Sequence, residues 1–115
     1  INSSTTDGAL SAMADLLTTN GVSFNGDDAL LLKQNGQVVD SIGRLGEDPG
    51  DYWGDTTGVC TLDMTLIRKT FLSDPNPFDT YVPSKEWTAQ AKDTFSFLGS
   101  HTPAVNKAKD WAVFE

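Results

Sequence analysis

The stretch FNGDDALLLKQNGQVVDSIG, residues 24–43, decides the fold because it joins two strand-like segments through a turn dipeptide. Residues 29–33 are apolar up to the final lysine, and residues 37–42 form a second segment of strand-forming composition. Asn35-Gly36 lies between them, and this dipeptide tolerates the positive φ angles of a two-residue hairpin turn. An apolar run without alternation is typical of a strand covered on both faces. We therefore predict a β-hairpin whose first strand lies in the centre of a sheet.

A glycine-rich segment follows the hairpin, at residues 43–58, where five glycines stand in a polar setting with one proline. This composition predicts a long loop, and loops of this length usually have a functional role. Apolar residues at helical spacing predict a helix over residues 8–17, and strand patterns indicate strands at 62–67 and 95–98. The tail, residues 103–115, has a weaker amphipathic pattern that predicts a second short helix.

The composition favours a single domain with an acidic surface. The chain has 115 residues, 38% of them hydrophobic, and a net charge of −8 from 16 acidic and 8 basic residues. Nucleic-acid binding through a broad surface requires clustered Lys and Arg, and the only adjacent basic pair is Arg68-Lys69. We therefore expect no direct nucleic-acid binding.

No apolar run in the sequence has the length of a membrane span, so we also expect no membrane insertion.

Cys60 and His101 are the only cysteine and the only histidine of the chain. A lone cysteine offers neither an internal disulfide nor the spacing of a metal site, so we expect Cys60 to be a buried, small apolar side chain. A disulfide with a cysteine outside this sequence is the alternative. His101 has no serine in a nucleophile-elbow context to act with, and we predict local hydrogen bonding for it. These residues therefore indicate no catalytic site.

Seven short segments together resemble the lamin tail domain family: FNGDDALLL, NG, VVDSIG, GEDPGDYWG, TLIRK, EW and FSFLGSH. The resemblance implies a mainly β fold, an immunoglobulin-like β-sandwich, here with one or two short helices. The family occurs in nuclear lamins and in secreted bacterial proteins, often beside nuclease or phosphoesterase domains. On this basis we assign residues 8–102 to the sandwich domain, preceded by a flexible segment at 1–7 and followed by the tail at 103–115.

One departure from the family concerns the beginning of the domain. Lamin tail domains normally start with two further strands, and no segment of that kind precedes the matched residues in this sequence. A sandwich that lacks two strands exposes sheet edges and part of its core. We therefore expect that the sequence begins inside the domain, or that another chain supplies the strands by edge addition.

Four residues are candidates for binding. Tyr52-Trp53 in the glycine-rich loop could form an exposed aromatic platform for a glycan or a protein, since aromatic side chains stack on sugars and anchor interfaces. The alternative is that Trp53 closes one end of the sandwich, and the resemblance favours this interpretation. Arg68 and Lys69 could contact a phosphate or an acidic partner, but the surplus of carboxylates favours ion pairs within the chain.

Acidic residues near turns are weak candidates for a calcium site, because Ca²⁺ takes several oxygen ligands. The candidates are Asp27, Asp28, Asp48 and Asp51. Their spacing does not match the D-x-[DN]-x-[DN]-G ligand loop, and aspartate is also a common turn and capping residue. Apart from this calcium site, we predict no cofactor.

The sequence, read with the resemblance, predicts a non-catalytic binding or positioning module of a larger, secreted bacterial protein. We expect an extracellular or cell-surface location and attachment to another protein or to a surface. The partners would be other domains of the same protein or another chain that supplies the missing strands. Two alternatives stay open: an accessory domain of an extracellular nuclease that helps to present DNA, and a structural subunit that assembles by strand exchange.

Overall fold

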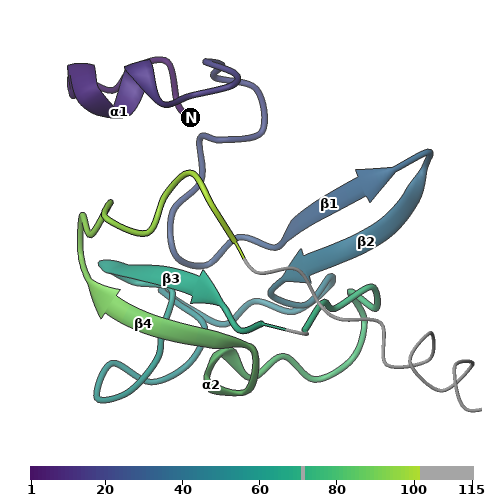
Figure 1. Ribbon diagram of the computed structural model, residues 1–115. Helices are drawn as coiled ribbons and strands as arrows, with labels where there is room; N and C mark the ends of the chain where they lie inside the picture. Colours follow the sequence, from purple (N-terminus) through teal and green to yellow (C-terminus); the bar gives the residue numbers. More distant parts are fainter. Residues whose placement is uncertain (71, 102–115) are drawn as a thin grey trace, which may run out of the picture.

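The computed structural model describes residues 1–70 and 72–101. These residues form two short helices and four strands: α1 (Gly8–Ala12), β1 (Leu30–Gln34), β2 (Gln37–Ile42), β3 (Met64–Arg68), α2 (Pro83–Glu86) and β4 (Trp87–Ala91). The strands make two antiparallel sheets of two strands each, β1–β2 and β3–β4 (Figure 1). The mainly β fold predicted from the sequence is therefore confirmed. The helix predicted at 103–115 lies outside the described residues.

The β1–β2 hairpin forms where the sequence predicts it. Asn35 and Gly36 have φ angles of 51° and 78°, so both central residues of the turn adopt the left-handed conformation of a two-residue hairpin. The prediction that the first strand lies in the centre of a sheet was wrong. β1 pairs only with β2 among the described strands, and the side chain of Leu32 is 63% exposed. The apolar run therefore presents part of its surface to solvent.

Several other boundaries differ from the sequence-based predictions. The first helix ends at Ala12, five residues before the predicted end, because the backbone N–H of Met13 already caps it by bonding to carbonyls of the helix. Residues 95–98 form turns and not a strand. The last strand is instead β4, which the sequence pattern did not indicate, and β3 is shifted two residues from the predicted start. β3 and β4 pair in regular register from Met64 opposite Ala91 to Arg68 opposite Trp87.

Residues 1–7, which we expected to be loose, make backbone contacts with the segment after α1. The N-terminal amine of Ile1 donates to the carbonyl oxygen of Leu16 at 2.8 Å, and Asn2 forms a parallel bridge with Thr18. Asp7 caps α1, since its Oδ1 accepts the backbone N–H of Leu10 at 2.9 Å. Hydrogen bonds to the segment after α1 thus hold the first residues of the chain in place.

The core is small and centres on Trp53. Its side chain is 4% exposed and meets Tyr81 edge to face, with ring centroids 5.6 Å apart. The indole Nε1 donates to the backbone carbonyls of Asp27 and Asp28, each at 3.2 Å, and so holds the entry into β1. Cys60 is 0% exposed, which confirms the predicted burial of this side chain.

Candidate functional site

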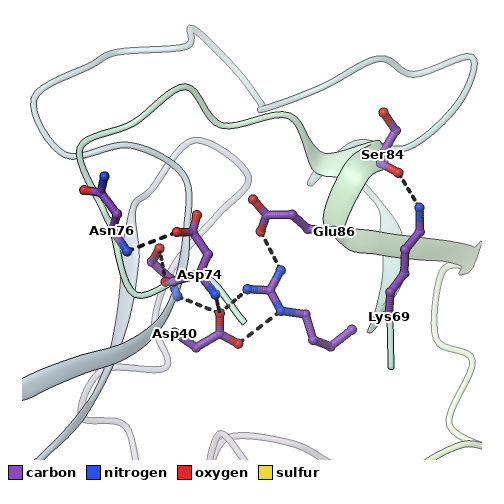
Figure 2. Close-up of polar contacts among 8 residues, drawn as sticks. Asp40, Lys69, Asp74, Asn76, Ser84 and Glu86 are labelled. Carbon is purple, nitrogen blue, oxygen red and sulfur yellow. Dashed lines mark hydrogen bonds and ion pairs between the residues drawn. The ribbon is translucent and has the colours of Figure 1, made fainter. Parts of the chain in front are cut away.

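A polar group centred on Arg68 joins the two sheets in the described part of the chain. We call it the Arg68 cluster, and its members are Asp40, Arg68, Asp74 and Glu86. The guanidinium of Arg68 donates to both carboxylate oxygens of Asp40 on β2 and to Oε2 of Glu86 on α2. Figure 2 shows the two carboxylates on opposite sides of the guanidinium. Only 10% of the Arg68 side chain is exposed, so this contact links β2, β3 and α2 in a partly desolvated setting.

Asp40 also fixes the segment that follows β3. Its Oδ1 accepts the backbone N–H of Asp74 at 2.8 Å and that of Ser41 at 3.0 Å. The hydroxyl of the buried Ser41 donates to the carbonyl oxygen of Asp74 at 2.8 Å. One carboxylate therefore accepts hydrogen bonds from β3, from its own strand and from the loop at residue 74.

The electrostatics of the cluster are set by three carboxylates around one guanidinium. Burial raises the pKa of Glu86, Arg68 opposes this effect, and the nearby Asp74 adds to it. Burial lowers the pKa of Arg68, but hydrogen bonds and charge interactions with Asp40 and Glu86 more than compensate and raise it overall. Burial, followed by the charge of Glu86, raises the pKa of the Tyr81 hydroxyl. Acidic charge thus exceeds basic charge in this region.

An apolar groove lies between the β1–β2 hairpin and the beginning of β4. We call it the hairpin groove; its volume is about 250 Å³, and Leu30, Leu31, Leu32, Asp40, Ile42 and Trp87 line it. The guanidinium of Arg68 lies over the Trp87 ring, 4.6 Å from its centroid, and fixes this side of the groove. Asp40 belongs both to the groove and to the Arg68 cluster. The groove therefore offers an apolar surface beside one paired carboxylate.

The sequence left two interpretations of Trp53, an exposed binding platform and a buried side chain, and the structure decides between them. Trp53 is buried in the core, so the exposed platform predicted for Tyr52-Trp53 was wrong for this residue. The physical reason is the pair of hydrogen bonds that its indole makes to Asp27 and Asp28. Tyr52 is half-buried and lies outside both the Arg68 cluster and the hairpin groove.

The basic pair at the end of β3 binds within the chain. Arg68 pairs with two carboxylates, which confirms for this residue the predicted ion pairs within the chain. The paired guanidinium has no free face for a phosphate. Lys69 lies next to it, but its Nζ donates to the carbonyl oxygen of Ser84 at 2.6 Å and not to a carboxylate. Arg68 therefore binds carboxylates, whereas Lys69 binds a backbone carbonyl.

The candidate calcium ligands do not converge in the described part of the chain. Asp28 accepts the backbone N–H of Asn25 at 3.0 Å, and Asp48 accepts that of Gly50 at 2.9 Å, as turn aspartates do. Asp27 presents its backbone carbonyl to Trp53, and Asp51 is exposed. Among residues 1–70 and 72–101, no three His, Cys, Asp or Glu side chains are grouped as a metal site.

Sequence reasoning missed Asp40, Glu86 and Trp87 as parts of the site. Asp40 did carry a signal, because a charged residue inside the apolar strand VVDSI requires a partner if it is buried. Nothing in the sequence identified that partner, since Arg68 lies 28 positions further along the chain. Trp87 appeared only within EW, one of the seven segments that carry the family resemblance.

Comparisons with known proteins add no identification. No family model matches the chain, and searches of curated proteins and of solved structures found no match. None of the helices among the described residues has both the length and the apolar character needed to cross a bilayer.

Proposed function

We propose that this chain is a non-catalytic β-sandwich of the lamin tail type that serves as a binding or positioning module in a larger, secreted bacterial protein. The hairpin with its Asn35-Gly36 turn, the two antiparallel sheets and the family motif around Trp53 support this assignment. The charges of the Arg68 cluster are engaged with one another, which favours a structural role for them over an acid–base role. The proposed setting is extracellular or at the cell surface.

The hairpin groove is the surface that carries the proposal. Exposed apolar surface beside a recess is typical of protein interaction sites, and Leu32 on its rim is 63% exposed. Full burial of one leucine side chain stabilises a complex by roughly 1.5–3 kcal/mol. Trp87 on the opposite side is held by Arg68, so a partner would meet a preformed surface. We therefore propose that an apolar side chain of a partner protein binds between Leu32 and Trp87.

A displayed library of random peptides tests this function with the full chain as bait. We expect enriched peptides with a large apolar residue, and we expect a synthetic copy of one of them to shift the NMR signals of Leu32, Ile42 and Trp87. Leu32→Asp should weaken binding at least about tenfold, a loss of about 1.4 kcal/mol. The matched control is Phe78→Asp, at a residue that is 64% exposed but lies outside the groove. Equal losses in both variants, or shifts confined to other surfaces, would refute the proposal.

The nuclease-accessory alternative lacks a supporting observation in the described residues. A DNA-presenting surface needs free Lys and Arg side chains, and the guanidinium of Arg68 is paired with Asp40 and Glu86. Salt-dependent binding of a DNA duplex, measured by fluorescence anisotropy, would revive this alternative. The absence of such binding is the result that the proposed module predicts.

A further inference from the structure

A second groove follows the edge of β3 that faces away from β4. We call it the edge groove; its volume is about 880 Å³, and it is lined by residues 65–68 of β3 and by residues of the segment 94–101. Figure 1 shows the chain after β4 passing back over this side of β3. Consecutive residues of a strand point to opposite faces, so a groove lined by four consecutive residues runs along the edge of the strand.

The register of β3 shows which backbone groups point toward the edge groove. The N–H of Lys69 donates to the carbonyl oxygen of Glu86 at 2.9 Å, so the bonds to β4 recur two residues back, at Ile67. The N–H and C=O groups of Leu66 and Arg68 therefore point away from β4. In the described part of the chain, no backbone group of another segment bonds to them. A strand edge of this kind can accept a further extended segment.

Apolar side chains with exposed surface stand along the segment opposite β3. Phe97 and Leu98 line the edge groove and are 55% and 47% exposed. Met13 is 52% exposed and reaches the same rim, since its Cε lies 3.7 Å from the position that a Cβ atom would take at Gly99. Exposed apolar surface beside a recess is typical of interaction sites. A strand paired with β3 could bring every second side chain against this surface.

The charges around the edge groove favour a cationic occupant. Asp15 is the acidic residue that lines the groove, and it forms no ion pair with a described residue. Arg68 also lines the groove, but its guanidinium is engaged by Asp40 and Glu86. The whole chain has a net charge of −8, so it attracts a segment that carries Lys or Arg and repels a second copy of itself.

We propose that the edge groove binds an extended, cationic segment of a partner protein. The backbone of this segment pairs with Leu66 and Arg68 and extends the β3–β4 sheet by one strand. Its apolar side chains pack against Phe97 and Leu98, and a Lys or Arg approaches Asp15. The edge groove shares no lining residue with the hairpin groove, so the two surfaces can be tested independently.

NMR of the full chain with one synthetic peptide tests this proposal. The probe is the capped heptapeptide Lys-Val-Thr-Val-Thr-Val-Lys, which alternates apolar and polar residues and has a cation at each end. At about 1 mM peptide we expect the amides of Leu66 and Arg68 to exchange at least about fivefold more slowly than in the free chain. The amide of Ile67, which faces β4, should exchange at the same rate in both. Leu32→Asp, in the hairpin groove, should leave these effects unchanged.

Two methylated forms of the same peptide test whether the contact is a strand pairing. One form carries methyl groups on the backbone nitrogens of its second and fourth residues, and the other on those of its third and fifth. Alternate amides of a strand point to opposite edges, so one form should bind at least about fivefold more weakly and the other should bind as the parent does. Equal affinities of the two forms, or unchanged exchange at Leu66 and Arg68, would overturn the proposal.

A matched pair of substitutions tests the charge of the occupant. Asp15→Asn should weaken peptide binding roughly threefold at low salt, whereas Asp51→Asn, at an exposed residue outside the groove, should change it much less. Equal affinities of these two variants would overturn the assignment of a cationic segment. Slow exchange of Leu66 and Arg68 that increases with protein concentration in the absence of peptide would also overturn it, since a second copy would then be the occupant.

Discussion

Replacing Gly43 with alanine should destabilise the fold, because the new Cβ atom would meet the buried Trp53 ring. Gly43 has a φ of +76°, and a Cβ atom there would lie 2.9 Å from both Cε2 and Nε1 of Trp53 and 3.2 Å from the Cα of Ala29. Left-handed backbone costs an alanine roughly 1–2 kcal/mol. Forcing the buried indole aside costs about 1–3 kcal/mol more and strains its hydrogen bonds to Asp27 and Asp28. The free energy of unfolding should therefore fall by about 2–5 kcal/mol.

Urea unfolding followed by tryptophan fluorescence measures this loss. Gly46→Ala is the matched control, because Gly46 has a φ of +80° but nothing within 4 Å of its Cβ position. It should lose only the backbone contribution of about 1–2 kcal/mol. The difference between the two variants isolates the close contact with Trp53, and it should shrink in a Trp53→Leu background. Equal losses for Gly43→Ala and Gly46→Ala would refute the packing of Trp53 against the turn after β2.

Two further predictions concern the polar cluster and the hairpin turn. Because burial raises the pKa of Glu86, the folded state holds its proton more tightly than the unfolded state, and this contribution to stability is lost as pH rises through the folded pKa. Glu86→Gln removes that loss, so its stability relative to wild type should improve as the pH rises above the ordinary range of a glutamate; urea midpoints that show a constant or opposite difference would contradict this. Asn35→Val should cost about 1–2 kcal/mol, since a β-branched residue fits the φ of 51° poorly, whereas Asn35→Gly should unfold near the wild-type midpoint. Equal midpoints for these two variants would contradict the turn geometry.

The hairpin could be predicted from the sequence because its determinants are local. Asn35-Gly36 selects the turn, and the turn sets Gln34 opposite Gln37 and Lys33 opposite Val38. Beyond these pairs the register shifts by one residue, so that Leu32 lies opposite Asp40. The environment of the hairpin could not be predicted in the same way. An apolar strand can be covered on both faces or can line an open groove, and only its neighbours in space decide; Leu32 shows the second outcome.

The candidate site was predicted only in part because its contacts span long distances in the sequence. The pairing of Arg68 with carboxylates was expected from the excess of acid, but the choice of Asp40 and Glu86 depends on how two sheets meet. β4 was missed because its sequence WTAQA alternates weakly and follows directly on α2. Residues 87–91 form a strand because they pair with β3, and their own sequence does not specify this conformation.

A double-mutant cycle between Asp40 and Arg68 tests most directly the claim that one charged contact joins the two sheets. The cycle compares the free energies of unfolding of Asp40→Asn, Arg68→Met, the double variant and the wild type at neutral pH. With the Arg68 side chain 10% exposed and bound to both Asp40 oxygens, we predict a coupling energy of about 1–3 kcal/mol. Additive losses, with coupling below about 0.5 kcal/mol, would show that Arg68 does not hold the β1–β2 hairpin against β3.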